Sequence, residues 1–258
     1  AERLHYLSVP PSAALPAVKM LADADLVERS RIVMEKPFGT DLDSARFLNA
    51  RLHEVFAEEQ IFRIDHFLGK EPAQNILAFR FANGLFEPIW NRNFIDHVQI
   101  DVPETLGLGK RAAFYEQTGA YRDMVVTHLF QILGFMAMEP PTALEPAPIS
   151  EEKNKVFRCL LPIDPAHVVR GQYTGYRREE GVDPQSDTET FTAQKHVSRR
   201  FGRGRPGAGP FDLRPGGRLQ DFTVLLWQAA RPRHPAGQVV VAVCHARYRA
   251  GRRGAGSL

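Results

Sequence analysis

The segment Ser30 to Ile64 reads SRIVMEKPFGTDLDSARFLNARLHEVFAEEQIFRI, and it holds two strand patterns on either side of one helix pattern. Ser30–Glu35 and Ile61–Ile64 are short apolar runs, whereas Leu42–Glu58 repeats its apolar side chains at helical spacing. A strand, a helix and a strand in this order predict two parallel strands joined by a crossover helix.

The same alternation continues toward the N-terminus. Leu4–Val9 has the pattern of a strand, and Pro10 with Pro11 ends it because proline cannot donate to a ladder. After a loop, Leu15–Val27 repeats apolar residues at helical spacing. We therefore predict a parallel sheet with crossover helices for the first part of the chain.

The pattern changes beyond Lys70, where strands no longer alternate with helices. Half-buried strands are predicted over residues 95–102, 168–173 and 188–195, and helices over residues 73–82 and 119–138. This order is typical of an α+β domain with an antiparallel sheet.

Bulk composition fits a globular protein. The chain has 258 residues, of which 43% are apolar and 24% charged, and its longest apolar run is too short to span a bilayer. No basic-then-apolar signal pattern is present, so we expect no membrane partner and a cytoplasmic location. Cys159 and Cys244 have neither disulfide-like nor metal-like spacing, and no metal site is expected.

The net charge of +3 hides a change of composition near His196. Residues 196–258 hold 12 Arg and 2 Asp with no Lys or Glu, a balance of +10, against −7 for residues 1–195. A frameshift near His196 would produce this change, and an Arg-rich disordered tail explains it equally well. The aromatic residues of the tail are scattered, so no nucleic-acid partner is predicted.

One short stretch combines three side chains that can bind anions or take part in proton transfer. Asp65, His66 and Lys70 lie within six positions, just after a strand. An ammonium and an imidazole suit a phosphate group, while the carboxylate can orient a second histidine that acts as a base. His128 can supply that base. Taken singly, each has a structural alternative: a core histidine, an aspartate capping a turn, or a solvated lysine.

Longer strings resemble the glucose-6-phosphate 1-dehydrogenase family from about Leu4 to Lys195. These strings, in chain order, are EKPFG at 35–39, RIDHFLGK at 63–70, FANGLFEPIWNR at 81–92, VPET at 102–105, YRDM at 121–124, THL at 127–129 and MEPP at 138–141. The resemblance implies oxidation of glucose 6-phosphate to 6-phosphogluconolactone, with hydride transfer to NADP, in the pentose phosphate pathway.

The resemblance also implies a role for individual residues. His128 would be the proton acceptor and Asp65 its partner. Substrate would be bound by His66 and Lys70 at the phosphate, by Glu104 and Asp123 at the hydroxyls, and by Lys36. Cofactor would be bound by Lys36, Tyr6, Pro10 and Pro11.

Three positions depart from the family's pattern without removing a proposed catalytic group. Phe67 stands where many relatives have tyrosine, Thr127 replaces an asparagine, and Gln117 replaces an aspartate. Because phenylalanine lacks the hydroxyl of tyrosine, one contact to the substrate phosphate is expected to be missing at Phe67.

The family's glycine-rich phosphate turn is expected before Leu4, so the chain is predicted to begin inside the nucleotide domain. The literal G-x-G-x-x-G at 202–207 is a chance match, because Pro206 removes a donor and no strand leads into it. Gly217 stands where the family has a further substrate-binding lysine. The residues that separate NADP from NAD are absent, and the resemblance favours NADP.

The predicted fold class is a partial doubly wound Rossmann domain followed by a partial α+β domain. The predicted parts are residues 1–66 for the nucleotide domain, 67–195 for the substrate domain, and 196–258 for a divergent tail that we expect to be disordered. The family forms homo-oligomers, and the tail replaces the sheet of its dimer contact. We expect this chain to lack activity by itself, and a catalytically dead sugar-phosphate-binding or interaction fragment is the alternative function.

Overall fold

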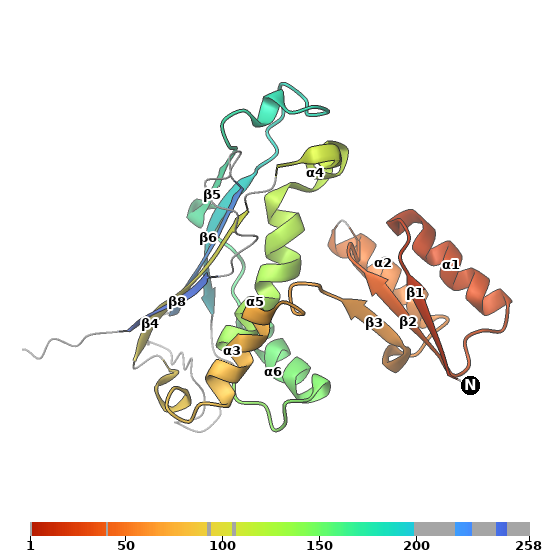
Figure 1. The fold of residues 1–258 in the computed structure, drawn as a ribbon, viewed down its shortest axis with the longest axis horizontal. Coiled ribbons are helices and arrows are strands. Elements are labelled where there is room, and N and C mark those ends of the chain that lie inside the picture. The colour runs from red at the N-terminus through yellow and green to blue at the C-terminus, as the bar shows by residue number, and fades with distance from the viewer. Residues whose placement is uncertain are drawn as a thin grey trace, which may run out of the picture. The chain divides into compact units, whose positions relative to one another are not determined.

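The chain divides into two units, Ala1–Gly69 and Lys70–Leu258, and each has its own sheet (Figure 1). The computed structural model describes residues 2–39, 41–91, 94–104, 107–198, 220–228 and 241–246. The division after Gly69 falls three residues beyond the predicted end of the nucleotide domain.

The first unit is a parallel three-stranded sheet with two helices. Its elements are β1 (Arg3–Leu7), α1 (Pro11–Asp23), β2 (Ser30–Glu35), α2 (Leu42–His53), η1 (Glu58–Gln60) and β3 (Ile61–Ile64). The strand order is β1-β2-β3, and both neighbouring pairs are parallel, as predicted.

Both helices of this unit pack on one face of the sheet. Ile32 and Met34 are two residues apart on β2, so they point to the same side, and both are buried in one apolar cluster. The same cluster contains Val18 from α1 together with Leu52 and Phe56 from the α2 side. Burial of this shared face holds the crossover helices on the sheet.

The bounds of α1 and α2 differ from the sequence predictions, and α1 ends at Asp23, four residues before the predicted Val27. α1 begins at Pro11 and not after a loop, because the first helical position tolerates a residue that has no amide donor. α2 ends at His53, five residues before the predicted Glu58. Asp41 caps the start of α2 by accepting a hydrogen bond from the Ser44 amide at 2.8 Å.

The second unit combines helices with a five-stranded sheet. Its helical elements are α3 (Glu71–Phe81), η2 (Glu87–Ile89), η3 (Gly109–Arg111), α4 (Ala112–Ala120), the π-helix η4 (Tyr121–Leu129), α5 (Phe130–Ala137), α6 (Pro146–Cys159), η5 (Pro165–His167) and η6 (Tyr176–Arg178). Its strands are β4 (Ile95–Glu104), β5 (Val168–Gly171), β6 (Phe191–Ser198), β7 (Gln220–Gln228) and β8 (Val241–Ala246).

The sheet order is β5-β6-β7-β4-β8, and every neighbouring pair except β4 and β7 is antiparallel. β7 and β8 belong to the part predicted to be a disordered tail, so that prediction is wrong for these two segments. The glycine motif at 202–207 and Gly217 lie outside the described residues.

A long helical rod formed by α4, η4 and α5 lies along this sheet (Figure 1). Val125, Leu129, Ile132 and Leu133 of the rod are completely buried. The sequence predicted a single helix over residues 119–138, but Gly119 has non-helical angles (φ 67°, ψ 170°) and the nine residues Tyr121–Leu129 wind as a π-helix. α6 was not predicted, because the prolines in its first turn obscured it.

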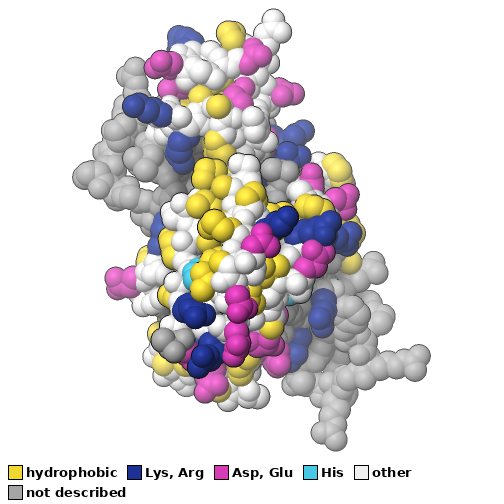
Figure 2. All heavy atoms as spheres, turned by 90° about the vertical axis from the view of Figure 1, so that its right-hand side faces the viewer, with side chains coloured by type: hydrophobic (Ala, Val, Ile, Leu, Met, Phe, Trp, Pro, Cys, Tyr) yellow, Lys and Arg dark blue, Asp and Glu magenta, His cyan; other side chains and the backbone are white. Residues whose placement is uncertain are grey.

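Charges of both signs are mixed over the described surface. On the face in Figure 2, basic and acidic side chains are interspersed with apolar ones. No helix among the described residues has the length and apolar content needed to cross a bilayer.

A completely buried guanidinium fixes the end of the rod. Arg80 of α3 donates from one nitrogen to the carbonyl oxygens of Phe135 at 2.8 Å and Met136 at 3.2 Å. Its other terminal nitrogen lies 3.5 Å from a carboxylate oxygen of Glu87. The Trp90 indole donates to the same Met136 oxygen at 2.8 Å. Two side chains thus satisfy carbonyls that the end of α5 leaves without helical partners.

Replacing Arg80 with alanine is expected to destabilise the second unit by about 3–5 kcal/mol, because it leaves Glu87 and two carbonyls without the buried cation. Equilibrium unfolding in denaturant measures the loss. Arg158→Ala is the matched control, since Arg158 is exposed on α6, and its effect should stay within about 0.5 kcal/mol. Equal effects of the two substitutions would contradict the role assigned to the buried guanidinium.

An ion-pair network joins α2 to β3 in the first unit. Glu58 accepts hydrogen bonds from Arg63 at 2.8 Å and pairs with His53 at 2.8 Å. The hydrogen bond from Arg63, followed by the contact with His53, lowers the pKa of Glu58 below its usual value. The carboxylate is therefore more strongly favoured in the folded chain than in the unfolded one.

This difference in pKa predicts a dependence of stability on pH. The contribution of Glu58 should be fully present above its unfolded pKa and should disappear as the pH falls through the lower folded pKa. Unfolding of the unmodified chain and of Glu58→Gln, compared across this acidic range, measures it. A stability difference that stays constant over the same range would refute the linkage.

Candidate active site

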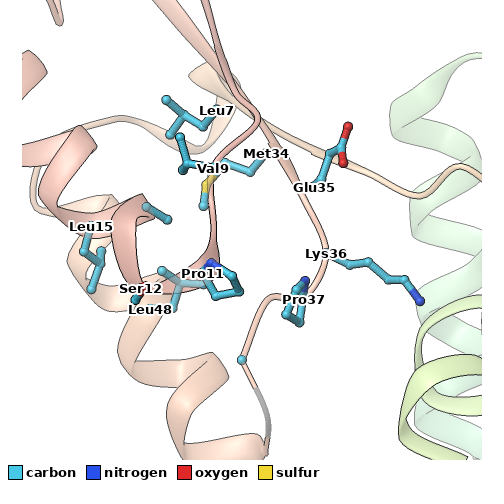
Figure 3. Close-up of a pocket in the computed structure, with 12 residues that line it drawn as sticks. Leu7, Val9, Pro11, Ser12, Leu15, Met34, Glu35, Lys36, Pro37 and Leu48 are labelled. Carbon is cyan, nitrogen blue, oxygen red and sulfur yellow. The ribbon is translucent and has the colours of Figure 1, made fainter. Parts of the chain in front are cut away.

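A cavity of about 230 Å³ opens at one end of the first unit's sheet (Figure 3). It lies at the carboxyl ends of β1 and β2 and at the start of α1, where Leu7, Val9 and Met34 form an apolar wall. Open α/β sheets bind ligands at this end of their strands. An apolar cavity at this position suits a flat ring better than a charged group.

The residues predicted to contact a cofactor are distributed unevenly around this cavity. Pro11 and Lys36 line it, whereas Tyr6 and Pro10 are not among its lining residues. Tyr6 instead donates a hydrogen bond from its hydroxyl to Glu35, which does line the cavity. In Figure 3 the side chains of Glu35 and Lys36 point away from the apolar wall.

The apolar wall itself was missed by the sequence analysis. Leu7 and Met34 belong to apolar strand patterns and Val9 lies just beyond β1, and such patterns do not distinguish a cavity wall from a core. The sequence signal that could have identified this wall is that Leu7, Val9 and Met34 lie at or near the carboxyl ends of predicted strands.

Asp65 and His66 begin a turn directly after β3. The Asp65 Oδ1 atom accepts a hydrogen bond from the Phe67 amide at 2.9 Å, and the Asp65 carbonyl accepts one from Leu68 at 3.1 Å. Phe67 is completely buried beneath the turn, whereas His66 is exposed. The predicted turn-capping role of Asp65 is therefore real. It fixes the direction of the carboxylate, which an orienting acid also requires.

Lys70 is the N-cap residue of α3, and its carbonyl accepts the first amides of that helix. The N-terminus of a helix carries a partial positive charge, which adds to the charge of the lysine that caps it. The Ala73 and Gln74 amides already donate to the Lys70 carbonyl and Pro72 has no amide hydrogen, so it is this combined positive charge that suits a phosphate.

Asp123 and His128 both lie on the π-helix η4 of the second unit. Residues five apart on an α-helix are separated by about 140° around its axis. In a π-helix the hydrogen bonds run from i to i+5, so residues five apart come close to alignment on one side. The winding thus brings these two side chains toward a common face of the helix.

The two side chains differ in their burial. His128 is 1% exposed and Asp123 is half-buried. Thr127 stands where the resemblance predicts an asparagine. Its hydroxyl donates a hydrogen bond to the backbone carbonyl of Asp123 at 2.6 Å. The side chain of Glu104, at the end of β4, lies outside the described part of the structure.

A buried phenol lies beside Asp123. Burial, and then the charge of Asp123, raise the pKa of Tyr115 well above its ordinary value, so the phenol stays protonated. The charge of Glu189 acts on Tyr115 in the same direction.

The predicted site residues are therefore divided between the units. Lys36, Asp65 and His66 belong to the first, and Lys70, Asp123 and His128 to the second. The pairing of Asp65 with His128 stays a prediction.

Gly39 is the residue of the EKPFG string whose identity the backbone requires. Its φ is +112°, and a Cβ atom there would lie 2.6 Å from the Ala45 amide nitrogen. Gly39→Ala should therefore destabilise the first unit by about 1–3 kcal/mol in equilibrium unfolding. Gly84→Ala is the control, because a Cβ at Gly84 meets no atom within 4 Å. A loss no larger than that of the control would show that the close approach is unimportant.

Two family profiles match the chain in sequence. "Glucose-6-phosphate dehydrogenase, NAD binding domain" matches residues 1–75, and "Glucose-6-phosphate dehydrogenase, C-terminal domain" matches residues 77–224. The second match continues past Lys195, where the resemblance was predicted to end.

Individual relatives agree with the profiles. Glucose-6-phosphate 1-dehydrogenase 1 of Mycobacterium tuberculosis (strain ATCC 25618 / H37Rv) is 46% identical over 190 residues, covering 74% of this chain and 41% of the relative. The crystal structure of the Mycobacterium avium enzyme has 40% identity and a TM-score of 0.77, covering 87% of this chain and 46% of that one.

A glucose-6-phosphate dehydrogenase in complex with glucose 6-phosphate has 28% identity and a TM-score of 0.76, covering 94% of this chain and 52% of that one. The chain thus spans about half the length of the relatives it matches. Because the two profiles together account for most of the chain, the chain belongs to the glucose-6-phosphate dehydrogenase family.

Proposed function

We propose that the chain carries the substrate-binding and proton-accepting groups for oxidation of glucose 6-phosphate to 6-phosphogluconolactone, with NADP as the hydride acceptor. The observation that carries this proposal is the junction of β3 and α3. There a turn-fixed carboxylate, an exposed imidazole and a helix-capping lysine follow one another at Asp65, His66 and Lys70.

The phosphate of the substrate binds at the start of α3. The ammonium of Lys70 and the partial positive charge of the helix start attract the phosphate, and His66 is exposed on the preceding turn to donate a hydrogen bond. Phosphate binding anchors the sugar at a distance from the reacting carbon, and such remote binding energy helps to orient the reacting groups.

His128 accepts the proton of the hydroxyl group that is oxidised. A buried imidazole is suited to this step, and Asp65 holds its tautomer and stabilises the imidazolium that forms. Asp123 shares the π-helix with His128 and binds a neighbouring sugar hydroxyl, and Glu104 binds another. The proton therefore moves from the sugar oxygen to His128.

The cavity at the ends of β1 and β2 fits the nicotinamide ring. Its apolar wall excludes water from a flat ring, and its position matches the usual ligand-binding edge of such sheets. When bound there, the cofactor would supply the acceptor for the hydride that leaves the sugar carbon. Lys36, at the edge of the cavity, lies between cofactor and substrate in this proposal. The family resemblance favours NADP over NAD.

A competing function is binding of the sugar phosphate without turnover. It would need only the groups at the junction of β3 and α3, without the proton and hydride transfers. In either case we place the protein in the cytoplasm, in keeping with its sparse cysteines.

Titration of the full chain with glucose 6-phosphate in a calorimeter tests the phosphate site. Lys70→Ala should weaken binding about tenfold or more, because it removes a charge-assisted contact of roughly 1.5–3 kcal/mol. In the presence of NADP, absorbance of the reduced nicotinamide should appear with the unmodified chain and be abolished by His128→Ala.

Lys110→Ala is the matched control for Lys70, since Lys110 is an exposed lysine of the same unit. Unchanged affinity in Lys70→Ala would exclude the phosphate assignment. Binding that depends on Lys70 without any reduced nicotinamide would favour the binding-only function.

A further inference from the structure

Glu189, just before β6, contacts the start of the π-helix with both its backbone and its side chain. Its carbonyl accepts a hydrogen bond from the Ala120 amide at 2.9 Å, and its Oε1 accepts one from the Tyr121 amide at 3.0 Å. The first amides of a helix have no partner within the helix. Glu189 therefore satisfies two successive donors at the point where the winding begins.

The carboxylate of Glu189 occupies a place that only a glycine leaves open. A Cβ atom at Gly119 would lie 2.6 Å from Oε1 and 2.9 Å from the carboxyl carbon of Glu189. Gly119 also has a φ of +67°, a conformation that favours glycine. The backbone break between α4 and η4 is thus shaped around this carboxylate.

The segment that presents Glu189 is itself held firmly. Glu116 of α4 accepts a hydrogen bond from the Ser186 hydroxyl at 2.8 Å, and its carbonyl accepts one from the Thr188 hydroxyl at 3.1 Å. The side-chain amide of Gln172 donates from Nε2 to the backbone carbonyls of Ser186 and Thr188, both at 2.9 Å. Because these contacts hold the segment before Glu189, the Glu189 carboxylate can in turn hold the Tyr121 amide in place.

We propose that Glu189 is a positioning residue that sets the rotation and register of the π-helix bearing Asp123 and His128. The inference rests on the proposed function of those two residues. Asp123 lies two residues beyond the amide that Glu189 binds, and His128 lies five residues further along the same helix. A change in the first turn therefore alters the direction of both side chains.

The charge of Glu189 adds to its hydrogen bonds. A carboxylate at the N-terminus of a helix is stabilised by the partial positive charge there. Glu189 and Asp123 also both act on the buried phenol of Tyr115, so the two acids face one common neighbour. Asp123, on the π-helix, and Glu189, which caps it, thus both interact electrostatically with Tyr115.

The test uses the full chain with three substitutions at Glu189 and two readouts. Glu189→Ala removes the side-chain acceptor and should shift the ¹H–¹⁵N resonances of the His128 imidazole and weaken glucose 6-phosphate binding about tenfold. Glu189→Gln keeps an acceptor oxygen and should restore both readouts to within about twofold in affinity. Glu189→Asp keeps the charge but shortens the side chain, and it should resemble alanine in the His128 resonances.

Asp187→Ala is the matched control, because Asp187 is an exposed acid two residues away. Unchanged His128 resonances in Glu189→Ala, even with a lowered melting temperature, would overturn the proposal and leave Glu189 a purely structural cap. If Glu189→Ala does not fold, the comparison of Glu189→Asp with Glu189→Gln decides in the same way. If the unmodified chain does not bind glucose 6-phosphate, the proposed function fails, and the His128 resonances alone decide the positioning role.

Discussion

The second unit depends on one buried cation. Arg80 binds the carbonyls of Phe135 and Met136, which belong to the last turn of α5, so it joins α3 to the end of the helical rod. A cation at a helix C-terminus is favourable, and a completely buried one cannot move without leaving acceptors unsatisfied. The helix that Lys70 caps is thereby fixed to α5, which follows the π-helix bearing His128.

The rod between these fixed ends is the least regular helix of the unit. Arg80 holds its C-terminal end and Glu189 holds the junction of α4 with η4, whereas the nine residues of η4 between these two points wind as a π-helix. Such winding is less favourable than an α-helix and persists where surrounding contacts determine it. Here it turns Asp123 and His128 toward one face, so local irregularity coincides with the residues proposed to meet the substrate.

This coincidence explains what the sequence could and could not predict. Ser30–Glu35 and Ile61–Ile64 were predicted to the residue, because apolar runs between polar turns define parallel strands clearly. The π-winding was not predictable, since a search for helical periodicity assumes 3.6 residues per turn. β7 and β8 were missed because composition suggested disorder, whereas strand pairing depends on neighbours far along the chain. The charged residues proposed for the site could be named from their chemistry and from the family resemblance, whereas the apolar cavity wall could not.

The position of Lys70 shows how the fold can contribute to binding. Its carbonyl accepts the Ala73 and Gln74 amides, so the lysine lies at the positively charged start of α3. In the proposed function a phosphate is attracted both by the ammonium and by this helix end, so the two contributions act at the same place. The contacts of Arg80 with the end of α5 hold in place the helix that Lys70 caps.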